Sequence, residues 1–125
     1  KVMLDQFLIF AQQNHRLRRL VGKVDVVITD SPILLSVIYN KAYSYNHNFN
    51  DFIMDIFNRY DNMNYFLKRT KKYNPIGRLQ TEEEAKEIDT KIKSLLDLCN
   101  VDYTEIEYNA DTVDIITDNI IRRLS

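Results

Sequence analysis

Glycine is scarce in this sequence of 125 residues, which contains only Gly22 and Gly77. A phosphate-binding loop of the form G-x-x-x-x-G-K-[ST] needs glycines so that successive backbone N–H groups can wrap around a phosphate. A dinucleotide-binding G-x-G-x-x-G turn also depends on several glycines. Gly22-Lys23 is followed by Val24, and Leu17 stands where the earlier glycine of a phosphate loop would be. The sequence therefore contains neither loop.

Cysteine and long apolar runs are also scarce. Cys99 is the single cysteine, which excludes an internal disulfide and is typical of a reducing, cytoplasmic compartment. We interpret it as a small buried residue rather than a reactive thiol. No apolar stretch approaches the roughly 20 residues that cross a bilayer. Asp5 and Gln6 interrupt the apolar stretch near the N-terminus, so we expect neither a membrane span nor a signal peptide.

Positive and negative charges nearly balance, with a formal net charge of -1. This balance disfavours non-specific binding of nucleic acid as the main function, although it allows a local basic patch. Hydrophobic residues make up 45% and charged residues 28% of the chain, which is typical of an ordinary globular protein. We find no internal repeat, low-complexity tract or linker, so the sequence predicts a single domain over residues 1–125.

The hydrophobic pattern predicts alternating helices and strands. A helical period over residues 2–21 ends in a cluster of arginines before Gly22, which is typical of a helix C-terminus. Residues 24–30 are β-branched and almost continuously apolar, the pattern of a parallel strand buried on both faces. Further helices are predicted at 33–43, 49–60, 81–99 and 111–124, and further strands at 64–69 and 103–108. This order predicts an α/β fold with a parallel sheet of about three strands flanked by helices.

The junction between the predicted strand 24–30 and the next helix is the first candidate site. Ser31 is expected to cap that helix and Pro32 to occupy its first position. In open α/β sheets, ligands bind beyond the carboxyl ends of strands. An aspartate at such an end, here Asp30, is the Walker B pattern, in which the carboxylate holds a nucleotide-bound Mg²⁺ directly or through water. The alternative is that Asp30 merely caps the following helix.

Residues 69–80 form a second candidate site, because they are basic, aromatic and rich in turn-forming residues. Kinases often carry Arg and Lys on a lid that closes over the phosphates and stabilises their charge. Arg69 and Arg78 are the favoured phosphate ligands, because a guanidinium binds phosphate in a bidentate manner. Lys72 is a further candidate, and Tyr73 could stack on a base or donate a hydrogen bond to a phosphate. The alternative is a solvated, charged loop.

Taken together, these segments resemble phage and bacterial AAA-type ATPases of the nicotinamide-riboside-kinase-like P-loop group. The resemblance covers nearly the whole chain. It lies in Asp5-Gln6, Phe10-Ala11-Gln12-Gln13, the run from Gly22 to Leu35 with Tyr39, and a lid-like run with Arg69, Tyr73-Asn74 and Gly77 to Ala85. It implies binding of ATP with Mg²⁺ and phosphoryl transfer to a small nucleoside- or nucleotide-like acceptor. Asp30 would then be the catalytic, Mg²⁺-associated acid, and Arg69 and Arg78 would be lid residues that face phosphates.

The sequence departs from this family in one large respect. Members open with a strand and a phosphate loop whose Lys and Ser/Thr hold the β- and γ-phosphates, and these elements would lie before Lys1. We therefore expect the chain to be the C-terminal portion of such a protein and to be inactive alone. The missing strand normally lies beside the Walker B strand, so residues 24–30 should present an unpaired edge and exposed apolar faces.

Two further interpretations follow from the same departure. The chain could form a homo-oligomer that covers the exposed edge. It could also be a non-catalytic binding module that retained the scaffold and lost the phosphate loop. A nucleic-acid binder that uses the Lys and Arg residues of the loop 69–80 is disfavoured by the net charge and because we identify a single basic patch.

Overall fold

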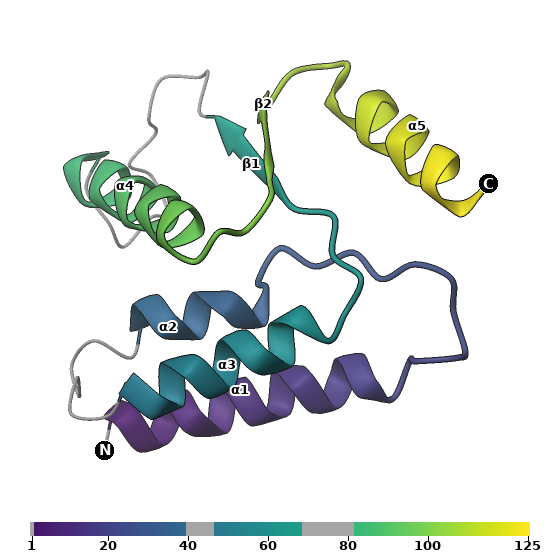
Figure 1. Cartoon of the computed structure of the whole chain (residues 1–125). Helices are drawn as coiled ribbons and strands as arrows, with labels where there is room; N and C mark the ends of the chain where they lie inside the picture. Colours follow the sequence, from purple (N-terminus) through teal and green to yellow (C-terminus); the bar gives the residue numbers. More distant parts are fainter. Residues whose placement is uncertain (1, 40–46, 69–81) are drawn as a thin grey trace. The chain divides into compact units, whose positions relative to one another are not determined.

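The computed structural model describes residues 2–39, 47–68 and 82–125. Their elements are α1 (Val2–Arg18), the 3-10 turn η1 (Ile33–Leu35), α2 (Ser36–Tyr39), α3 (His47–Asn58), β1 (Tyr65–Lys68), α4 (Glu82–Leu98), β2 (Thr104–Glu107) and α5 (Thr112–Leu124). Figure 1 shows an α/β fold of mostly helices, in which the described strands form a two-stranded parallel sheet. The chain divides into two compact units, Lys1–Asn62 and Met63–Ser125, and each is described by itself. A single domain over residues 1–125 therefore stays a prediction.

The first unit is built from α1, η1, α2 and α3 around a small apolar core. Apolar residues of α3 recur at spacings of three and four, which places Ile53, Ile56 and Phe57 on one buried face. Ile33 and Leu34 of η1 are buried as well. Because η1 contacts both α1 and α3, this short turn links the two longer helices through the core.

Aromatic rings join α1 to α3. The ring of Phe10 meets the rings of Phe49 and Phe52 edge-on, with centroids 5.9 and 6.0 Å away. Phe7 stacks on Phe49 at 5.4 Å. Offset and edge-to-face arrangements are the geometries that aromatic pairs prefer, so these contacts fix how the two helices lie against each other.

The predicted N-terminal helix ends at Arg18, a few residues earlier than expected. Successive turns follow, in which the Leu20 and Val21 amides donate to the carbonyls of Leu17 and Arg18 at 3.0 and 3.2 Å. Gly22 then adopts a φ of 80°, a conformation that side-chain-bearing residues rarely tolerate. The prediction that Gly22 caps the helix is therefore wrong, because α1 ends four residues earlier, and Gly22 lies instead in the turns that follow it.

The predicted strand over residues 24–30 is wrong, because the structure places neither a strand nor a helix there. A strand is defined by backbone hydrogen bonds to a neighbouring strand, and no described strand pairs with these residues. Their side chains are exposed rather than buried on both faces, and Ile28 is 81% exposed. The predicted sheet of about three strands accordingly has two strands in the described residues. The apolar residues of this run are exposed as expected, but the expected unpaired strand edge is absent because no strand forms there.

The second unit is a parallel β-α-β arrangement followed by α5. Strands β1 and β2 pair in parallel, with Tyr65 opposite Thr104. Successive side chains of a strand point to opposite faces, so Tyr65 and Phe66 lie on different faces of the sheet. Lys93 of α4 lies 5.0 Å over the Phe66 ring, and Asn119 of α5 donates to the Tyr65 hydroxyl at 3.1 Å. Helices α4 and α5 therefore cover opposite faces, as the alternation of elements predicts.

Helix α5 covers its face only in part. Ile116 and Ile120 are half-buried, but Val113 and Leu124, which the pattern placed on the same face, are 71% and 58% exposed. The face of a two-stranded sheet is narrow, so it accommodates only part of the apolar stripe of a helix. The apolar surface of α5 is consequently more exposed than its sequence predicts.

Candidate functional site

Asp30 lies at a bend in an exposed segment that leads directly into the buried turn η1. The Ser31 amide donates to the Thr29 hydroxyl oxygen at 3.1 Å, and the Ser31 hydroxyl donates to Oδ1 of Asp30 at 3.3 Å. These local bonds order the three residues around the Asp30 carboxylate. The carboxylate itself faces solvent, and its remaining oxygen is accessible to a ligand.

The helix cap beside Asp30 differs from the prediction. Pro32 rather than Ser31 occupies the N-cap position of η1, with φ of -60° and ψ of 146°, and its carbonyl accepts the Leu35 amide at 3.0 Å. Ser31 makes no cap hydrogen bond, because its hydroxyl is directed to Asp30 instead. Asp30 therefore does not cap this turn, and the alternative role considered for it from sequence is wrong.

The chemistry of Asp30 is compatible with a shared magnesium site. Mg²⁺ prefers oxygen ligands and is usually held by one or two carboxylates together with substrate phosphates and water. Within residues 2–39, 47–68 and 82–125, no group of three or more His, Cys, Asp or Glu side chains could hold a metal ion. In the described residues, Asp30 is therefore not one member of an all-protein metal site.

The predicted lid residues lie outside the described part of the chain. Arg69, Lys72, Tyr73 and Arg78 all belong to the segment between β1 and α4 that the structure does not describe. Their proximity to Asp30 and their role in phosphate binding therefore stay predictions.

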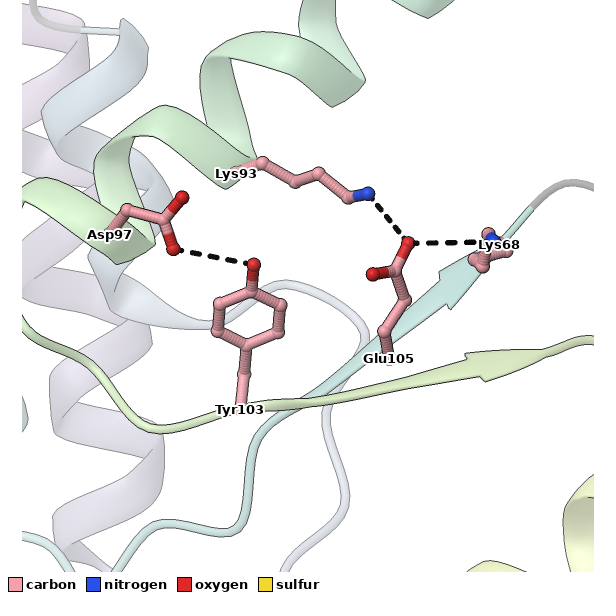
Figure 2. A network of polar contacts seen from close by, with 5 residues as sticks. All are labelled: Lys68, Lys93, Asp97, Tyr103 and Glu105. Atoms are coloured by element: carbon pink, nitrogen blue, oxygen red, sulfur yellow. Dashed lines mark hydrogen bonds and ion pairs between the residues drawn. The ribbon is translucent and has the colours of Figure 1, made fainter.

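A network of polar side chains, shown in Figure 2, connects α4 to both strands of the second unit. Oε1 of Glu105 lies 2.5 Å from Nζ of Lys93 and 3.9 Å from Nζ of Lys68. Beside this trio, the Tyr103 hydroxyl donates to Oδ1 of Asp97 at 3.4 Å. Strand β1 supplies Lys68, β2 and the residues before it supply Glu105 and Tyr103, and α4 supplies Lys93 and Asp97. The network thus fastens α4 onto one face of the sheet.

The electrostatics of this network favour charged, fixed groups. The hydrogen bond from Lys93 lowers the pKa of Glu105, and the same bond raises the pKa of Lys93. Partial desolvation raises the pKa of Tyr103, and the charge of Asp97 acts in the same direction. At neutral pH the ammonium stays protonated and the carboxylate ionised. Lys93 would act as a base or nucleophile only after losing its proton, which its raised pKa opposes, and the lowered pKa of Glu105 makes its carboxylate a weaker base. This arrangement is therefore suited to fastening α4 rather than to acid–base catalysis.

We expect stability to depend on pH through Lys93 and Glu105. The pKa of folded Glu105 lies below its ordinary value of 4.5, so its contribution is present above that value and is lost as the pH falls through the folded pKa. The pKa of folded Lys93 lies above 10.5, so its contribution is present below that value and is lost as the pH rises through the folded pKa. Thermal unfolding followed by circular dichroism from acid to alkaline pH should show both losses.

The matched pair for this measurement is Glu105→Gln and Glu107→Gln. Both glutamates lie on β2. Of these two, only Glu105 forms an ion pair with a lysine in the described residues. Glu105→Gln should flatten the acid limb of the profile, whereas Glu107→Gln should leave it unchanged. An identical acid limb in the wild type and in Glu105→Gln would contradict the role of the pair.

Sequence analysis missed this network. The only signal available was the spacing of four residues between Lys93 and Asp97, which places them on one face of α4. The participation of Lys68, Tyr103 and Glu105 depends on the register of β1 against β2, which is a tertiary property.

The membrane prediction can be compared with the structure directly. None of the helices in the described residues is both long and apolar enough to span a bilayer. Comparison with known proteins adds no relative: no protein-family model, curated protein or solved structure matches this chain.

Proposed function

We propose that this chain contributes the acidic, magnesium-associated part of the nucleotide site in a P-loop ATPase or kinase that acts on a small nucleoside- or nucleotide-like acceptor. The observation that carries the proposal is the position of Asp30. Its exposed carboxylate ends an apolar run and is held beside a turn whose Ile33 and Leu34 are buried. An acid in this context is the kind of ligand that a nucleotide-bound cation takes.

Each candidate residue has a defined part in this proposal. The cation would neutralise the phosphate charge, and Asp30 would hold it directly or through water. Arg69, Lys72 and Arg78 would bind the phosphates, and Tyr73 would contact the base or a phosphate. The sequence contains no glycine-rich phosphate loop, so that loop would come from a polypeptide segment other than these 125 residues. The chain by itself would bind nucleotide weakly without transferring phosphate.

Isothermal titration of the chain with ATP and Mg²⁺ tests this proposal. We expect Asp30→Ala to weaken binding by at least about tenfold in Mg²⁺, because a carboxylate ligand of the cation is lost, and to have little effect in chelator. Asp25→Ala is the matched control, since it removes the same charge from the same exposed segment. Equal affinities of the two variants, or no binding at millimolar ATP, would argue against a nucleotide site at Asp30.

A non-catalytic binding module is the second candidate, favoured by the exposed apolar run that contains Val24, Val26, Val27 and Ile28. Such a run is an association surface, and a strand from a partner or from a second copy would cover it. Two results together would favour this candidate. The chain would bind no nucleotide in the titration, and sedimentation of the same sample would show a mass that rises with protein concentration.

A further inference from the structure

Charge is distributed unevenly along the first unit. Between Phe7 and Val24 the sequence contains no aspartate or glutamate, while it places four cations within eight residues. We refer to these four, Arg16, Arg18, Arg19 and Lys23, as the basic end of α1. The net charge of the whole chain is -1, so this positive charge is local and is balanced elsewhere.

The basic end of α1 is exposed on an ordered backbone. All four side chains are exposed. The Arg19 amide donates to the His15 carbonyl at 3.1 Å, and the Lys23 amide donates to the Leu20 carbonyl at 2.9 Å, so hydrogen-bonded turns hold the segment beyond the helix. In the part of the chain that the structure describes, none of the four cations forms an ion pair.

The helix dipole explains only part of this arrangement. Cations are favoured in the last turn of any helix, which suits Arg16 and Arg18. Arg16 and Arg19 are three residues apart and are therefore neighbours on the surface, where like charges repel. Helix α5 also ends in two arginines, but Asp118 lies four residues before Arg122, a spacing at which opposite charges attract on a helix. No acid lies three or four residues from any cation of the basic end of α1, so this surface is complementary to an anionic partner.

An aromatic ring adjoins these cations. The Tyr60 hydroxyl donates to Oδ1 of Asn14 on α1 at 2.6 Å, and Tyr60 is half-buried. Burial raises the pKa of Tyr60, and the positive charge of Arg18 opposes that rise. On the surface of α3, Asp55 forms an ion pair with Arg59 at 2.9 Å.

We infer that the basic end of α1, together with Tyr60, is a binding surface for single-stranded nucleic acid. Guanidinium groups bind phosphates in a bidentate manner, and a partly exposed aromatic ring beside them can stack on an unpaired base. A lipid surface is the competing partner, because Phe7, Leu8 and Ile9 of α1 are exposed although Phe10 is buried against Phe49 and Phe52. The ring of Tyr60 beside the cations favours nucleic acid, and the vesicle competition described below distinguishes the two. Duplexes offer phosphates but no unpaired base for Tyr60.

Fluorescence anisotropy of a labelled oligothymidine of about 20 nucleotides, titrated with the full chain between 50 and 200 mM salt, tests the inference. We expect Arg16→Ala/Arg19→Ala to weaken binding by about tenfold or more and to reduce the salt slope by roughly 1.4, since each lost phosphate contact on a single strand contributes about 0.7. The matched control is Arg122→Ala/Arg123→Ala, which removes the same charge from the end of α5 and should leave both values unchanged. Circular dichroism of each variant monitors folding.

Two substitutions of Tyr60 separate stacking from charge. Tyr60→Phe keeps the ring and should bind the oligonucleotide nearly as well as wild type, whereas Tyr60→Leu should bind several-fold more weakly with an unchanged salt slope. The inference is overturned if the chain does not bind the oligonucleotide at 50 mM salt, or if the α5 control loses as much affinity as the α1 variant. It is also overturned if poly-glutamate or phosphatidylserine vesicles displace the labelled oligonucleotide as well as unlabelled oligonucleotide does when the competitors are added at equal total negative charge.

Discussion

Replacing Ile53 by alanine is expected to destabilise the Lys1–Asn62 unit by about 2–5 kcal/mol, the usual cost of truncating a buried isoleucine. Ile53 is 0% exposed and lies at the centre of the face that α3 turns toward the core. In the described residues of this unit, five other large apolar side chains are buried, namely Phe10, Ile33, Leu34, Ile56 and Phe57. Truncation of Ile53 therefore leaves a cavity in a packed core, and the surrounding structure relaxes only partially. A loss of this size is a large fraction of the stability of a domain of ordinary size.

Hydrogen exchange followed by mass spectrometry is the suitable measurement, because it reports on α1 and α3 separately from the second unit. The expected loss corresponds to a roughly 30-fold to several-thousand-fold drop in amide protection across these helices. Ile53→Val removes one methyl group and should cost only about 0.5–1.5 kcal/mol. Val113→Ala on exposed α5 should leave protection of α1 and α3 unchanged. A change below about 1 kcal/mol for Ile53→Ala would show that this face does not form the core.

Thr112→Val is expected to destabilise the Met63–Ser125 unit by about 1–3 kcal/mol, the cost of leaving buried polar groups without partners. Thr112 is 3% exposed, and its hydroxyl makes two bonds at the junction of β2 and α5. It donates to the Glu107 carbonyl at 2.8 Å and accepts the Asn109 amide at 2.8 Å. Valine has nearly the same shape, so the substitution removes these bonds while leaving the packing almost intact.

Urea denaturation followed by circular dichroism, with hydrogen exchange of residues 107–112, measures this effect. Thr112→Ser keeps the hydroxyl and should recover much of the lost stability. Thr117→Val changes an exposed threonine of the same helix and should stay within about 0.5 kcal/mol of wild type. A cost below about 0.5 kcal/mol for Thr112→Val would show that the two hydrogen bonds contribute little to stability. A cost for Thr112→Ser as large as that for Thr112→Val would show that packing of the methyl group contributes as well.

The structure describes one of the two predicted parts of the nucleotide site and not the other. Asp30 is exposed and ordered by Ser31, but it does not stand at the end of a strand as the hydrophobic pattern predicted. Residues 69–80 lie outside the described residues. The titration with Asp30→Ala and Asp25→Ala therefore tests the half of the site whose geometry is known.

Some of the fold is determined by the sequence alone. The spacing of Phe49, Ile53 and Phe57 specifies the buried face of α3, because a helix repeats every 3.6 residues whatever its neighbours are. The positive φ of Gly22 follows from glycine being the residue that adopts it without strain. The alternation of strands and helices after residue 63 specifies a parallel pair with a helix on each face.

Other features were decided by the tertiary structure. Residues 24–30 have the composition of a buried strand, yet a strand forms only where another strand accepts its hydrogen bonds, and the described residues provide none. Lys68, Lys93 and Glu105 meet because β1 and β2 pair in one particular register. Helical periodicity and glycine conformation are local properties, so they can be predicted directly from the sequence. Strand pairing and salt-bridge networks join distant residues, so their outcome depends on which partner is present and in which register it binds.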